Sequence, residues 1–69
     1  MIAVVVPALA AVERGELVAC APEEWPVVRR ALQDRAGRWI EQRQDIRAIL
    51  ALREVQRLDA RFHYPLGAP

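Results

Sequence analysis

The sequence contains no lysine, serine, threonine or asparagine, and it has only one cysteine and one histidine. The lack of serine and threonine excludes the hydrolases and transferases that use a serine or threonine nucleophile. The lack of asparagine leaves no acceptor for N-glycosylation. The single cysteine, Cys20, cannot form an internal disulfide bond, and Cys20 with His63 falls short of the four ligands of a structural zinc site. We therefore expect no catalytic centre, no cofactor and no metal.

Size and composition favour association with another chain. A chain of 69 residues forms one domain at most and buries a small share of its surface. Its hydrophobic fraction of 54% is more than so small an interior can hide. Ten arginines stand against nine acidic residues, and a formal net charge of +1 gives little long-range attraction for a nucleic acid. These features predict a protein partner, either a second copy of this chain or a larger protein.

The apolar stretch at the N-terminus does not have the pattern of a targeting or membrane segment. No positively charged region precedes it, and Glu13 and Arg14 end it. A membrane-spanning helix needs about 20 apolar residues, which is more than this stretch supplies. We therefore expect a cytoplasmic protein without a membrane span.

The region 1–21 has two short apolar runs separated by a turn. The β-branched run Val4–Val6 and the second run 16–21 flank a turn that Gly15 could close, which favours a β-hairpin. Pro7 would then place the first strand at an edge. The competing interpretation is a short helix, with Pro7 in its first turn and Gly15 just past its end.

The region 22–62 is predicted to be helical, and 63–69 is predicted to form an extended tail. An apolar stripe with helical spacing keeps its phase across Gly37, which favours one long helix from residue 26 to 62. After Leu50 the stripe moves to a second face, so a break near Gln44 or at Gly37, giving a helical hairpin, stays open. The fold class is mainly α in either case.

An uninterrupted helix would be roughly 55 Å long, and its two apolar faces could not both be covered by the N-terminal segment. The sequence therefore predicts a homodimer. The predicted oligomer interface consists of Trp25, Val28, Leu32, Trp39, Ile46 and Leu50.

Arginines form a row near the end of the helical region. Arg53, Arg57 and Arg61 are spaced four residues apart and repel one another, so an anionic surface of a partner would stabilise them. The predicted function is non-catalytic protein binding, as an adaptor, an inhibitor or an assembly subunit. The alternatives are a small nucleic-acid-binding regulator that uses this row, and association of the apolar N-terminus with a membrane surface. The predicted partner-binding residues are Arg53, Arg57, Arg61, Val55, Leu58, Phe62 and Tyr64.

Overall fold

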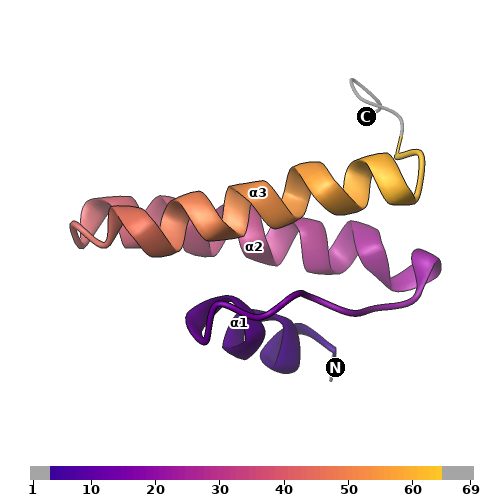
Figure 1. Ribbon diagram of the computed structural model, residues 1–69, viewed down its shortest axis with the longest axis horizontal. Helices are drawn as coiled ribbons and strands as arrows, with labels where there is room; N and C mark the ends of the chain where they lie inside the picture. The colour runs from indigo at the N-terminus through magenta and orange to yellow at the C-terminus, as the bar shows by residue number, and fades with distance from the viewer. Residues whose placement is uncertain (1–3, 65–69) are drawn as a thin grey trace.

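The computed structural model describes residues 4–64 of the chain. Two long helices run antiparallel as a hairpin, and a shorter helix packs against them (Figure 1). The described residues contain no strand, so the prediction of a mainly α protein is confirmed. The elements in chain order are helix α1 over Val5–Glu13, a 3-10 turn over Pro22–Glu24, helix α2 over Trp25–Glu41 and helix α3 over Asp45–Arg61.

The N-terminal segment forms helix α1, so the predicted β-hairpin is wrong and the alternative of a short helix is correct. Pro7 lies in the first turn of α1. Proline is tolerated there because the backbone N–H groups of the first turn have no acceptor within the helix, so none is lost. Gly15 follows the helix with a φ of +70°, a left-handed conformation that glycine adopts without steric cost. Ala8, Ala11 and Val12 recur at helical spacing and are all buried. This packing outweighs the preference of valine for strands.

The second apolar run, 16–21, is extended and runs back along the helical hairpin (Figure 1). The side chain of Val18 is buried, whereas its neighbours Leu17 and Ala19 are exposed. This alternation is the two-residue period of an extended backbone. The segment therefore has the extended form that the hairpin prediction gave it, but it lies against helices instead of another strand.

Helix α2 continues through Gly37, as the phase of the apolar stripe predicts, and ends at Glu41, so the alternative of a break at Gly37 is wrong. The turn Gln42–Gln44 then reverses the chain, and Arg43 takes a left-handed φ of +61° there. One uninterrupted helix is therefore also wrong, and the helical hairpin with a break near Gln44 is correct. Asp45 is the first residue of α3, where its carboxylate meets the positive end of the helix dipole.

The reversal packs the two apolar helical faces against each other inside one chain. Ile46 and Leu50 leave the predicted face because the helical phase starts afresh in α3: Ile46 is 75% exposed and Leu50 is half-buried. The homodimer was expected because a helix of roughly 55 Å would leave an apolar face uncovered. This molecule measures 30 × 25 × 21 Å and contains no such helix among its described residues, so the structure does not support that reason for a homodimer. Four of the six predicted interface residues belong to the core of the single chain: Trp25, Val28, Leu32 and Trp39.

Helix α3 ends at Arg61, and the next residues close it. His63 takes a left-handed φ of +52°, and the N–H of Tyr64 donates to the carbonyl of Asp59 at 2.8 Å. The predicted tail thus starts with a helix-terminating turn. The rest of it, 65–69, lies outside the described residues.

Substitution by alanine should have opposite effects on stability at the two glycines that the structure describes. Gly37→Ala should raise the free energy of unfolding by about 1 kcal/mol, because alanine is the better helix former and its Cβ meets no atom within 4 Å. The matched control Gly15→Ala also has open space, but its φ of +70° should lower stability by about 1 kcal/mol. Urea unfolding followed by circular dichroism measures both. Effects of the same sign would contradict these backbone assignments.

Candidate functional site

Two charged side chains of α3 hold the extended segment through the backbone of one residue. The Glu54 carboxylate accepts the Val18 N–H at 2.7 Å, and the Arg57 guanidinium donates to the Val18 carbonyl at 2.9 Å. Glu54 and Arg57 also pair with each other, at 2.7 and 2.9 Å. Because both polar groups of Val18 are satisfied by side chains, the segment is fixed to α3 without a partner strand. We refer to this arrangement of Glu54, Arg57 and Val18 as the clamp.

The clamp sets the charge states of its own groups. Burial alone would raise the pKa of Glu54, but hydrogen bonds from Arg57 and from the Val18 N–H, together with the charge of Arg57, lower it. The hydrogen bond to Glu54 raises the pKa of Arg57. Nearby, burial and the charge of Glu24 raise the pKa of the Cys20 thiol, and Arg57 offsets this in part. The clamp is therefore a permanent ion pair at neutral pH, and the thiol beside it is protonated.

A hollow lies on each side of the clamp. One, of about 260 Å³, lies between the extended segment and the end of α3, and Arg61 and Phe62 are among its lining residues. The other, of about 120 Å³, includes Leu50 and Arg53 in its lining. Leu17 lines both hollows and is 71% exposed. We call the surface formed by Leu17, Leu50, Arg53, Arg57 and Arg61 the α3–loop face.

The α3–loop face gathers only part of the predicted partner-binding set. Arg53 and Arg61 are exposed on it, and Arg57 lies between them within the clamp. Phe62 is half-buried in the wall of the larger hollow. Leu58 lines the larger hollow but is buried, and Val55 is buried in the core. Tyr64 lies away from this face and stacks with Arg29, whose guanidinium carbon is 4.8 Å from the centre of the Tyr64 ring.

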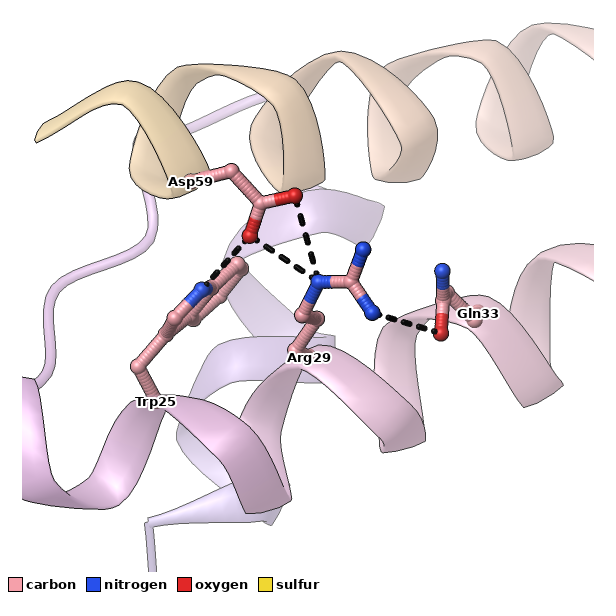
Figure 2. A network of polar contacts seen from close by, with 4 residues as sticks. All are labelled: Trp25, Arg29, Gln33 and Asp59. Carbon is pink, nitrogen blue, oxygen red and sulfur yellow. Dashed lines mark hydrogen bonds and ion pairs between the residues drawn. The ribbon is translucent and has the colours of Figure 1, made fainter. Parts of the chain in front are cut away.

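A second polar cluster joins the start of α2 to the end of α3 (Figure 2). The Asp59 carboxylate accepts the Trp25 indole N–H at 2.8 Å and the Arg29 Nε–H at 2.9 Å. Arg29 also donates to Gln33 at 3.4 Å. The Trp25 ring is fully buried and lies 6.1 Å from the Phe62 ring. This cluster joins the two helices at the open end of the hairpin.

Sequence reasoning missed both structural carboxylates. Glu54 is the one buried charged residue among residues 4–64, and Asp59 is largely buried beside Trp25. The sequence does indicate that Glu54 is buried, because Glu54 follows Ala51 by three residues and precedes Leu58 by four, on the apolar face of α3. A carboxylate on an apolar helix face indicates that another side chain or backbone group of the protein forms a hydrogen bond or ion pair with it.

No three His, Cys, Asp or Glu side chains in residues 4–64 gather closely enough to hold a metal ion. None of the helices in that range has the length and hydropathy needed to cross a membrane. No protein-family model, curated protein or solved structure matches this chain. Any function proposed for it must therefore rest on its own surface.

Proposed function

We propose that this chain is a non-catalytic protein-binding protein that presents its α3–loop face to a larger protein. The observation that supports this most is the pair of arginines on either side of the clamp. Within residues 4–64 the side chains of Arg53 and Arg61 make no hydrogen bond and no ion pair. Two unpaired cations beside an exposed Leu17 form a mixed apolar and charged surface of the kind that protein interfaces use.

The clamp adds a reason to favour this face over the rest of the surface. Leu17 is next to Val18, whose backbone is bonded on both sides to α3. A surface that is already fixed loses less conformational entropy on binding than a mobile loop would. Roles as an adaptor, an inhibitor or an assembly subunit would all use such a preorganised face.

Photo-crosslinking tests the proposal directly. A photoreactive amino acid in place of Leu17 should capture a discrete protein in the source cells, whereas the same group in place of Val27, which is exposed on α2, should not. The double substitution Arg53→Glu with Arg61→Glu should abolish the capture. The matched control is Arg30→Glu with Arg38→Glu, two exposed arginines of α2, which should leave it intact. Capture that ignores both the position of the probe and the charge reversal would refute the assignment.

We further propose self-association through the tip of the hairpin, in place of the interface expected from the sequence. Ile40 at the end of α2, with Ile46, Ile49 and Leu52 along the start of α3, are exposed large hydrophobic residues. Ile46 and Ile49 are one helical turn apart on α3, and large apolar side chains exposed in this way favour burial against another chain. Light scattering after size exclusion should give a mass near twice 7.8 kDa, and Ile46→Glu with Ile49→Glu should return it to 7.8 kDa. A mass of 7.8 kDa at every concentration would rule the association out.

A further inference from the structure

The chemistry of the partner follows from the spacing of the unpaired arginines. We infer that the α3–loop face binds an extended acidic segment of its protein partner, with two carboxylates four residues apart that meet Arg53 and Arg61. This inference rests on the proposed protein-binding function and specifies its ligand.

The spacing of the arginines matches an extended peptide. Arg53 and Arg61 are eight residues apart on α3, which is roughly 12 Å along the helix axis. In an extended chain, residues i and i+4 point to the same side and are roughly 13 Å apart. A carboxylate three residues away instead would point to the opposite side. A segment with acidic residues at i and i+4 can therefore reach both guanidinium groups at once.

The middle of the site calls for an apolar side chain. Arg57 lies midway between the two free arginines, and Glu54 already neutralises it. Leu17 lines the hollows on both sides of the clamp and is largely exposed. Residue i+2 of an extended ligand points to the same side as its two carboxylates and would lie over Leu17. An apolar residue there would bury part of the exposed leucine.

A peptide with two separate carboxylates fits this face better than a nucleic acid does. A phosphate backbone carries negative charge along its whole length. Here the charge between Arg53 and Arg61 is neutralised, because Glu54 pairs with Arg57, and Glu16 beside Arg53 pairs with Arg14. The chain as a whole carries only +1. A continuous polyanion would find no unpaired cation in the middle of the site, whereas two discrete carboxylates at its ends would each meet an arginine.

The test is a titration of the full-length ¹⁵N-labelled chain, followed by NMR. The ligand is a nine-residue peptide with two glutamates four positions apart, a valine midway between them and threonine elsewhere. Its control has the same composition with the glutamates three positions apart. We expect saturable shifts confined to the amides of 17–20 and 53–62, with at least about threefold weaker binding of the control, which can engage one arginine at a time.

Variants assign the effect to the two arginines. Arg53→Gln and Arg61→Gln should each weaken binding about threefold, and the pair about tenfold, because the two positions are distant enough to act independently. Arg30→Gln with Arg38→Gln on α2 should leave the affinity unchanged. The spectrum of each variant without peptide shows whether it is folded.

Three results would overturn the inference: equal affinity for the two peptides, shifts elsewhere on the surface, or no shift at millimolar peptide. Stronger shifts of the same amides by a twelve-nucleotide oligothymidylate than by the peptide would favour a nucleic acid and also overturn it. If crosslinking at Leu17 still captures a protein in a charge-dependent way, only the ligand class is wrong. If that capture fails as well, the protein-binding function falls with it.

Discussion

Glu54→Ala should lower the free energy of unfolding by about 2–3 kcal/mol and release the extended segment from α3. The substitution leaves the buried N–H of Val18 without an acceptor and Arg57 without its ion-pair partner. An unsatisfied buried donor costs about 1–3 kcal/mol, and the charged partner adds to this. The cost of leaving Arg57 without its ion-pair partner is modest, because its side chain is 36% exposed and water can solvate the charge.

Urea unfolding measures the change in stability, and hydrogen exchange of the Val18 amide reports on the segment. Glu54→Gln is an informative intermediate, since its carbonyl can still accept from Val18 but it carries no charge for Arg57. We expect about 1 kcal/mol of destabilisation for this variant. Glu41→Ala, at an exposed position of α2, serves as the control and should stay within about 0.5 kcal/mol of the parent. Unchanged protection of the Val18 amide in Glu54→Ala would contradict the clamp.

The clamp also predicts a pH dependence with a definite sign. The pKa of Glu54 is lower in the folded chain than its ordinary value of 4.5. The ionised carboxylate is therefore favoured by folding, and its contribution is fully present above pH 4.5. It is lost as the pH falls through the folded pKa. The stability gap between the parent and Glu54→Gln should hence be constant near neutral pH and should narrow in acid, and a gap that widens in acid would reverse the assigned direction.

The helical pattern of this chain could be predicted because it is local. The apolar spacing that carries one helix through Gly37 depends on neighbouring turns only, and it appears directly in the sequence. The turn at Gln42–Gln44 was harder to place, because Arg43 takes the left-handed conformation without the glycine that usually marks it. In the N-terminal segment the valine run predicts a strand from local preference, whereas burial of Ala8 and Val12 against the rest of the chain favours the helix.

The candidate site could be predicted only in part for a related reason. The arginine row is visible from its four-residue spacing, and the structure brings all three members to one face. The role of Glu54 depends on Val18, 36 residues away in the sequence, and no local pattern links the two. Similarly, Val55 and Leu58 share the helix with the arginines, but the chain reversal at Gln42–Gln44 turns them into the core.

Asp59→Ala should destabilise the chain by about 2–3 kcal/mol through the open end of the hairpin. The Asp59 side chain is 11% exposed and accepts hydrogen bonds from Trp25 and Arg29 (Figure 2). Without it, the indole N–H of a fully buried tryptophan has no acceptor. Arg29 can turn partly to water, since its side chain is 22% exposed, so most of the loss comes from Trp25.

A double-mutant cycle separates the two contributions. Trp25→Phe removes the indole N–H and keeps an aromatic ring in the core, so Asp59→Ala should be about 1.5–2 kcal/mol less damaging in that background than in the parent. Arg29→Gln in the same cycle should show a smaller coupling to Asp59, because the ion pair is partly exposed. Equal damage in the Trp25→Phe background and in the parent would mean that the indole hydrogen bond contributes nothing to joining the helices. The cost of Asp59→Ala would then come from the loss of the Arg29–Asp59 ion pair, and this pair, with the apolar contact of Trp25 and Phe62, would hold the hairpin at this end.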